Sequence, residues 1–148
     1  MLGEKGKVVN EALKIPAGTF FITSILLAVP HTMVFVDNVE ETDVVGIGKQ
    51  IEKHPCFPQG TNVNFVQVIN PHEIKVRTWE RGAGCTLACG TGSCASAVAS
   101  ALNGKTGKKV TVHLGLGDLI IDWVEDAVFM TGPVGYVFSG SFETKDMM

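Results

Sequence analysis

Short runs of apolar residues, separated by turn-forming residues, follow one another along most of this chain of 148 residues. Such runs are typical of β-strands. The runs predicted as strands are 20–27, 32–37, 62–69, 73–79, 109–114, 118–124, 127–131 and 136–142. In 73–79 apolar and polar residues alternate with a period of two, which indicates an antiparallel strand buried on one face.

A helical spacing of apolar residues appears first in the segment 39–54. Its apolar positions run from Val44 to Ile51, and Thr42 or Asp43 is suited to cap the first turn. Two glycines early in the segment each weaken the helix by about 1 kcal/mol relative to alanine. We therefore expect a helix here whose first turns are its weakest part.

The segment 93–102 is a second predicted helix, ended by Asn103 and Gly104. It contains no charged residue and almost no large side chain, so that no face of it is suited to water. A helix this slim can be enclosed by a curved sheet. We therefore predict an α+β fold in which an antiparallel β-sheet or barrel wraps around a central buried helix, as a single domain over residues 1–148. Within it, residues 1–17 are a possible linker remnant, although a frayed strand at 5–14 stays open.

Charge and hydropathy exclude two classes of partner. The formal net charge is −3 and no cluster of basic residues is present, which argues against nucleic-acid binding. The longest apolar run, 20–36, is interrupted by Pro30 and His31 and is too short to span a membrane. The polar opening residues do not resemble an export signal, so we expect a cytoplasmic protein.

The four cysteines are Cys56, Cys85, Cys89 and Cys94. Three of them lie within ten residues of one another, which is unsuited to a disulfide framework, and reduced thiols are expected. The paired cysteine or histidine spacings of a zinc site are missing, so we expect no metal. We interpret Cys56 as an ordinary loop thiol and Cys94 as a packing residue, whereas the role of Cys85 stays open.

Cys89 is the cysteine placed for chemistry, because it stands at the mouth of the second predicted helix. The backbone N–H groups and the positive end of the helix dipole favour a thiolate there. Gly90 and Gly92 leave the backbone donors open to a ligand, which predicts a cradle for a carboxylate. Glu80 and Arg81 end the strand that enters the same loop and could bind an ammonium and a carboxylate group. By spacing alone, a functional and a packing role for Cys89 are about equally supported.

The run from Glu80 to Ala95 reads Glu-Arg-Gly-x-Gly-x-Thr-x-Ala-Cys-Gly-Thr-Gly-x-Cys-Ala and resembles the signature of the diaminopimelate epimerases. The resemblance extends upstream to Phe-Pro-Gln-Gly-Thr-Asn-Val-Asn-Phe at 57–65. It also includes the segments 30–37, 110–112, 117–119 and 130–133. It therefore covers nearly the whole chain after about residue 18.

This resemblance implies an isomerase that works without pyridoxal phosphate or any other cofactor and interconverts LL- and meso-2,6-diaminopimelate. The product serves lysine and peptidoglycan synthesis. In that family two cysteines flank the substrate's α-carbon, one removing the proton and the other returning one to the opposite face. By resemblance, Cys89 is the second of these cysteines and Glu80 acts with it at the reacting centre. Substrate binding is implied for His31, Asn62, Arg81, Gly90 and Thr91.

The chain departs from the family in two ways. Ala28-Val29-Pro30-His31 stands where the family has Gly-Asn-Pro-His, so Val29 cannot make the asparagine's hydrogen bonds. Family members are also two-domain proteins of about twice this length, and this chain matches the C-terminal half, without the first cysteine. We expect the isolated chain to be inactive unless an N-terminal domain or a homo-oligomer partner supplies the second thiol.

Three alternative functions stay open on the sequence. The first is another isomerase of the same fold group, either proline racemase-like or phenazine-type, since proline racemases also place Cys-Gly-Thr-Gly at a helix mouth. The second is a non-catalytic fragment that binds substrate or associates with another chain. The third is a thiol redox module formed by Cys85 and Cys89, although their spacing is not C-x-x-C.

Overall fold

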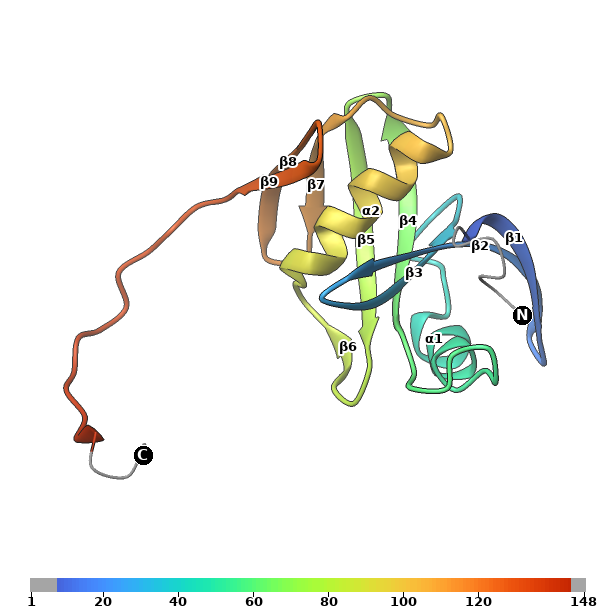
Figure 1. The fold of residues 1–148 in the computed structure, drawn as a ribbon, viewed down its shortest axis with the longest axis horizontal. Coiled ribbons are helices and arrows are strands. Elements are labelled where there is room, and N and C mark those ends of the chain that lie inside the picture. The colour runs from blue at the N-terminus through green and yellow to red at the C-terminus, as the bar shows by residue number, and fades with distance from the viewer. Residues whose placement is uncertain (1–7, 145–148) are drawn as a thin grey trace.

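The computed structural model describes residues 8–144 and shows one mixed sheet with two helices (Figure 1). The strands are β1 (Val8–Ile15), β2 (Gly18–Leu27), β3 (Val29–Phe35), β4 (Asn62–Asn70), β5 (Glu73–Glu80), β6 (Gly84–Thr86), β7 (Lys109–Leu114), β8 (Gly117–Val124) and β9 (Ala127–Thr131). The helices are α1 (Val44–Glu52) and α2 (Gly90–Leu102). The strand order is β1-β2-β3-β4-β5-β7-β8-β9, and β6 pairs with β5.

Most neighbouring strands are antiparallel, but β3 pairs with β4 and β5 pairs with β7 in parallel. Parallel neighbours need a crossover connection, and each of these two crossovers contains one of the helices. On β4, Val63 and Phe65 join the core that α1 covers, whereas Val66 joins the core around α2. Since side chains alternate along a strand, the two helices cover opposite faces of the sheet.

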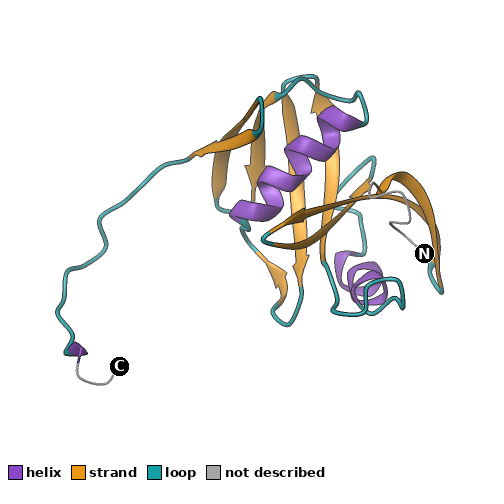
Figure 2. Cartoon of the chain, in the orientation of Figure 1, coloured by secondary structure: helices purple, strands orange, loops and turns teal. Residues whose placement is uncertain are grey.

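Helix α2 is the buried central helix that its small side chains predicted (Figure 2). It lies against β2, β3, β4, β5, β7, β8 and β9, and most of its residues are buried. The sheet curves around it without closing, because β1 and β9 are not paired with each other. The prediction of an α+β domain with a sheet around a buried helix is therefore confirmed, but the sheet is mixed rather than antiparallel, and residues 8–144 form no closed barrel.

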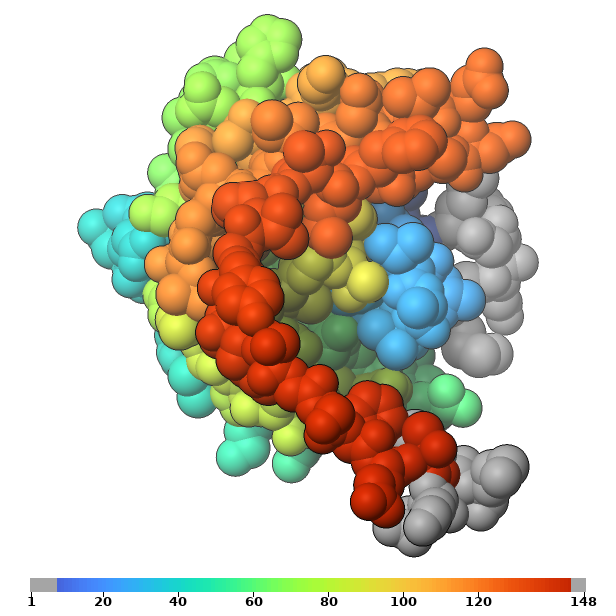
Figure 3. Space-filling view, turned by 90° about the vertical axis from the view of Figure 1, so that its left-hand side faces the viewer, coloured from blue at the N-terminus to red at the C-terminus, as the bar shows by residue number. Residues whose placement is uncertain are grey.

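The strand predicted at 136–142 is not formed. After β9 the chain leaves the sheet, and residues 132–143 have no regular secondary structure (Figure 1). Figure 3 views the molecule from the side on which this segment leaves. Its large apolar side chains are exposed, with Tyr136 at 84% and Phe138 at 80% of full accessibility. The composition of the segment suits a strand, but a strand needs a neighbour to pair with, and residues 8–131 provide none.

The N-terminal segment is a strand over its described part. β1 pairs with β2, from Ile15 opposite Gly18 to Val8 opposite Ser24, with an irregularity between Val8 and Glu11. The expectation of a linker remnant is thus replaced by a strand for residues 8–15, while residues 1–7 lie outside the described part.

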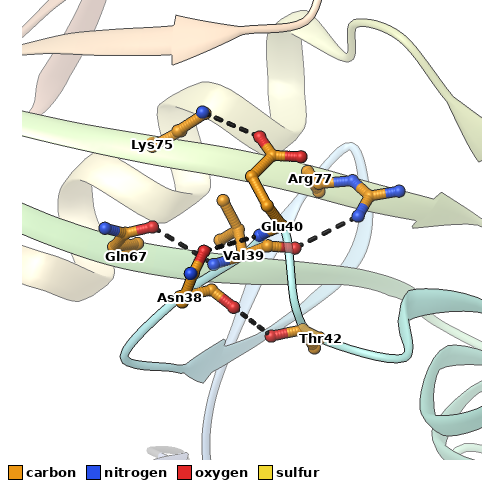
Figure 4. Close-up of polar contacts among 7 residues, drawn as sticks. All are labelled: Asn38, Val39, Glu40, Thr42, Gln67, Lys75 and Arg77. Atoms are coloured by element: carbon orange, nitrogen blue, oxygen red, sulfur yellow. Dashed lines mark hydrogen bonds and ion pairs between the residues drawn. The ribbon is translucent and has the colours of Figure 1, made fainter.

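Helix α1 is shorter than the predicted segment 39–54. Asp43 is its N-cap and accepts a hydrogen bond from the Gly46 N–H over 2.9 Å, whereas Thr42 donates to the Asn38 carbonyl over 2.7 Å. The residues before the cap are bound to the sheet instead (Figure 4).

The loop before α1 is held by polar contacts with β4 and β5. The Val39 N–H donates to Gln67 Oε1 over 3.1 Å, and Arg77 donates to the Val39 carbonyl over 3.1 Å. Lys75 forms an ion pair with Glu40 at 2.7 Å (Figure 4). These contacts satisfy backbone groups that a longer helix would have used, so the helix begins only at Val44.

Helix α1 is fastened to β5 through Trp79. The indole N–H donates to Glu52 Oε2 over 2.6 Å, and the helix approaches so closely that a Cβ at Gly48 would lie 2.6 Å from the Trp79 Cβ. This contact holds the end of β5, where Glu80 is the last residue of the strand and Arg81 follows it. Neither α1 nor α2 is long and apolar enough to cross a membrane, and no other α-helix occurs among residues 8–144.

Candidate functional site

The predicted site residues gather at one end of the sheet. His31 near the start of β3 pairs with Asn62 at the start of β4, and antiparallel β5 brings its last residues to the same end. The N-terminus of α2 reaches this end of the sheet as well, since Gly92 in its first turn lies against Asn64 on β4. Four segments that are separate in the sequence thus contribute to one site.

Cys89 is the N-cap of α2 and has extended backbone angles, φ −142° and ψ 108°. Its sulfur accepts a hydrogen bond from the Gly92 N–H over 3.3 Å, and its carbonyl accepts from the Ser93 N–H over 2.9 Å. The helix begins three residues earlier than the predicted 93–102, because the thiol itself caps the first turn. The sulfur thus lies at the positive end of the helix dipole, beside the first N–H groups of the helix.

Gly92 is required by close packing. A Cβ there would lie 2.5 Å from Asn64 Oδ1 and 3.1 Å from the Cys89 sulfur. Gly90 is less constrained, since its added Cβ would meet the flexible Met130 side chain at 3.2 Å. The first N–H groups of a helix have no partner within the helix, so those of Gly90 and Thr91 are suited to bind an anionic ligand.

His31 is fully buried, and its Nε2 atom has no hydrogen-bond partner among the described residues. Burial lowers the pKa of His31, while the nearby Glu80 carboxylate acts in the opposite direction. Glu80 itself accepts a hydrogen bond from the Thr86 hydroxyl over 2.6 Å. His31 is therefore neutral at neutral pH, beside a carboxylate that the loop holds in place.

Asn62 and Arg81 are joined by a hydrogen bond, so the side-chain oxygen of Asn62 is already occupied within the domain. The Arg81 backbone N–H donates to Asn62 Oδ1 over 2.8 Å. The Arg81 guanidinium donates to the Gln59 carbonyl over 2.7 Å and is exposed. This leaves further guanidinium donors of Arg81 available at the mouth of the site.

Asn64 and Thr78 belong to the site and were not among the predicted residues. Asn64 contacts His31, its amide Nδ2 lying 3.3 Å from His31 Nδ1, and it accepts from the Thr78 hydroxyl over 2.9 Å. A signal was present in the sequence, because Asn62 and Asn64 are the polar residues among the first five of a strand that is otherwise apolar there. Polar residues that repeat with a period of two share one face, and here that face is the one covered by α2.

The other cysteines lie elsewhere. Cys94 is buried in the core around α2, and its pKa is raised, mainly by burial, as suits a packing residue. Cys56 is half-buried with its sulfur 2.9 Å from His54 Nδ1, and burial raises its pKa as well. Cys85 is exposed on β6. In the part of the chain described, no three His, Cys, Asp or Glu side chains are placed to hold a metal ion.

Comparison with known proteins gives the family of this chain. A sequence model described as "Diaminopimelate epimerase" matches residues 23–137. The diaminopimelate epimerase of Pelotomaculum thermopropionicum is 49% identical over 143 residues, covering 96% of this chain and 51% of the relative. That of Desulfitobacterium hafniense is 53% identical over 134 residues, covering 90% and 47%.

Solved structures show the same fold at low sequence identity. A probable proline racemase from Agrobacterium radiobacter, with bound carbonate, has a TM-score of 0.64 at 16% identity and is matched over 93% of this chain and 51% of its own. A hydroxyproline epimerase from Agrobacterium vitis, with bound trans-4-hydroxy-L-proline, has a TM-score of 0.57 at 15% identity, with 82% and 44% covered. The chain spans about half the length of the curated relatives that it matches. By the match over residues 23–137 and the identity to these relatives, the chain belongs to the diaminopimelate epimerase family.

Proposed function

We propose that this chain is the second domain of a diaminopimelate epimerase and that Cys89 is one of its two acid/base thiols. The observation that supports this most directly is the position of the Cys89 sulfur. It lies at the N-cap of α2, hydrogen-bonded by the Gly92 N–H and next to the N–H groups of Gly90 and Thr91, which have no partner within the helix. A thiol and a carboxylate cradle at one helix end are what proton transfer at an amino acid's α-carbon requires.

In this proposal the α-carboxylate of diaminopimelate binds the N–H groups of Gly90 and Thr91. When the α-proton leaves, negative charge spreads onto the carboxylate, and donors already in place stabilise it in the transition state. Cys89 exchanges a proton with the α-carbon on one face, as thiolate or as thiol. Glu80 and Arg81 supply charges that complement the ammonium and carboxylate groups of the substrate.

Inversion of the α-carbon needs a second acid/base group on the opposite face, which donates a proton when Cys89 removes one and removes one when Cys89 donates. The relatives are about twice as long, which supports a missing domain as its source. An N-terminal domain or a second copy of the chain would cover the exposed apolar side chains of 132–144. We expect the assembled enzyme to act in the cytoplasm, where thiols stay reduced, without a cofactor and without nucleic-acid or membrane partners. Lysine and peptidoglycan precursor synthesis would consume its product.

The experiment is to incubate the reduced chain with LL-diaminopimelate in D₂O and follow the α-proton by NMR, with and without the N-terminal domain of a relative. We expect inversion to the meso form only when that domain is present. Cys89→Ser should abolish it, whereas Cys85→Ser, at an exposed thiol outside the site, should retain it. Retained inversion in Cys89→Ser, or no exchange in the wild-type mixture, would contradict the proposal.

A non-catalytic fragment is the second candidate, and Val29 is the observation that favours it. Val29 begins β3 beside the site, and its side chain can make no hydrogen bond to a substrate. Binding of diaminopimelate without α-proton exchange, in the presence of the N-terminal domain, would support this function. Offering proline to the same mixture tests the proline racemase-like alternative.

A further inference from the structure

The imidazole of His31 has one hydrogen-bonded and one unpaired nitrogen, and Asn64 is the residue that distinguishes them. We propose that Asn64 is a positioning residue that holds His31 in the tautomer with its proton on Nε2, so that the site presents a fixed N–H donor. The use of that donor for substrate rests on the proposed function, whereas the tautomer itself does not.

The side-chain amide of Asn64 has a partner for each of its polar atoms. Its Nδ2 group lies 3.3 Å from His31 Nδ1 and 3.7 Å from Met33 Sδ, and its Oδ1 accepts from the Thr78 hydroxyl over 2.9 Å. Asn64, His31 and Met33 are fully buried. Because all three side chains are buried, the partners of the Asn64 amide are these neighbouring groups rather than solvent.

Met33 decides which way the amide faces. A hydroxyl can donate or accept, so Thr78 is compatible with either orientation of Asn64. A thioether sulfur can only accept, and it therefore requires the NH₂ group on the side of His31. Since that NH₂ group donates, His31 Nδ1 must accept and has no proton. In a neutral imidazole the proton is then on Nε2.

The Nε2–H group that results is buried without an acceptor among the described residues. Buried polar groups without a partner are rare in folded proteins, so an acceptor is expected from outside this domain. An oxygen of the bound substrate is the acceptor that fits a site already provided with carboxylate-binding N–H groups. The neutral state of His31 suits this role, because burial lowers its pKa even beside Glu80.

The same amide also connects His31 to the thiol. Asn64 Oδ1 lies against Gly92, whose N–H donates to the Cys89 sulfur. One buried side chain thus orients the imidazole and limits the space at the N-terminus of α2. A side chain at position 92 would displace the amide and release His31 at the same time.

The test is the ring ¹⁵N spectrum of the full chain, with His31 assigned by comparison with His31→Gln. We expect an unprotonated Nδ1 and a protonated Nε2. In Asn64→Asp the carboxylate should draw a proton to Nδ1 and raise the His31 pKa by about one unit or more. Asn70→Asp makes the same change of charge at the far end of β4 and should leave His31 unchanged.

A wild-type spectrum with the proton on Nδ1 would overturn the proposal, and this measurement needs no variant to fold. An unchanged His31 spectrum in a folded Asn64→Asp would overturn it as well. Since neither readout uses substrate, the inference and the proposed function can fail separately. Suppose that His31 has its proton on Nε2 but the chain, mixed with the N-terminal domain, does not exchange the α-proton of diaminopimelate. That result would contradict the proposed enzyme function and leave the proposed tautomer standing.

Discussion

The backbone N–H of Gly92 donates a hydrogen bond to the sulfur of Cys89 over 3.3 Å, within the first turn of α2. The thiol therefore caps the helix at the place where the helix dipole favours negative charge. The same glycine lies against Asn64, so one residue without a side chain serves both the thiol and the buried polar network.

Gly92→Ala should damage both functions. Its Cβ would meet Asn64 Oδ1 at 2.5 Å and the Cys89 sulfur at 3.1 Å. We expect a loss of about 1–3 kcal/mol in the free energy of unfolding, as for overpacked cores, together with loss of α-proton exchange. Urea denaturation and the D₂O assay measure the two effects. Gly107→Ala, where the nearest atom to the added Cβ is the Pro71 carbonyl oxygen at 3.9 Å, is the control and should change neither.

Gly48→Ala should detach α1 from β5. The added Cβ would lie 2.6 Å from the Cβ and 2.7 Å from the Cγ of Trp79, and neither atom can move without moving the strand. We expect about 1–3 kcal/mol of destabilisation, measured by denaturation and by the fluorescence of Trp79. Val45→Ala, at an exposed position of the same helix, should cost no more than about 0.5 kcal/mol. Equal stability of the two variants would show that the helix can shift away from the strand.

Ala28→Gly should stabilise the protein. Ala28 connects β2 and β3 with φ +61°, in the left-handed region that costs an L-residue roughly 1–2 kcal/mol. The greater freedom of glycine in the unfolded chain offsets about 0.5–1 kcal/mol of that gain. The net effect is a modest rise in the thermal midpoint. Ala127, the first residue of β9, has no positive φ, so Ala127→Gly should lower the thermal midpoint. A lower midpoint for Ala28→Gly would contradict the argument.

His113 should make stability depend on pH. It lies 2.8 Å from Asp118 and 3.3 Å from Glu73, and its pKa is raised, first by the hydrogen bond to Asp118. A raised pKa in the folded state adds stability below the usual value of about 6.5. That stability is lost as the pH rises through the folded value.

His113→Gln should therefore cost more stability at about pH 5.5 than at about pH 8.5, by no more than about 1 kcal/mol, since the pair is partly exposed. Denaturation at the two pH values measures the difference. His72→Gln, in the exposed turn before β5, is the comparison variant. A His113→Gln effect that is the same at both pH values would rule out the ion pairs as its cause.

The segment after β9 should affect association but not the stability of this domain. Its exposed apolar side chains make no contribution to either core, so Tyr136→Ser with Phe138→Ser should change the free energy of unfolding by less than about 0.5 kcal/mol. The same double variant should bind an N-terminal domain more weakly, and sedimentation measures this binding. Unchanged binding would show that the segment does not reach the partner.

Several elements could be predicted from the sequence because their signals are local. Alternation along 73–79 identified β5, and the small uncharged residues of α2 identified a buried helix that strands enclose. The glycines around Cys89 indicated a thiol at a helix mouth, because the N-terminus of a helix has the same donors wherever it occurs.

Other features depended on contacts between distant segments. Asp43 rather than Thr42 caps α1 because β4 and β5 bind the loop before it. Residues 136–142 form no strand because none of the strands within residues 8–131 lies beside them. Whether the sheet closes is likewise decided by the pairing of its edges, which no local pattern encodes.

The site divides in the same way. The sequence by itself determined which residues have suitable chemistry, including Cys89, Glu80 and His31, since reactivity belongs to the side chain and its motif. Only the tertiary structure decided that Asn64 joins His31 to Gly92, because β3, β4 and α2 meet there. Hydrogen-bond partners in a buried network are set by three-dimensional proximity, and residues 31, 64 and 92 are adjacent only after folding.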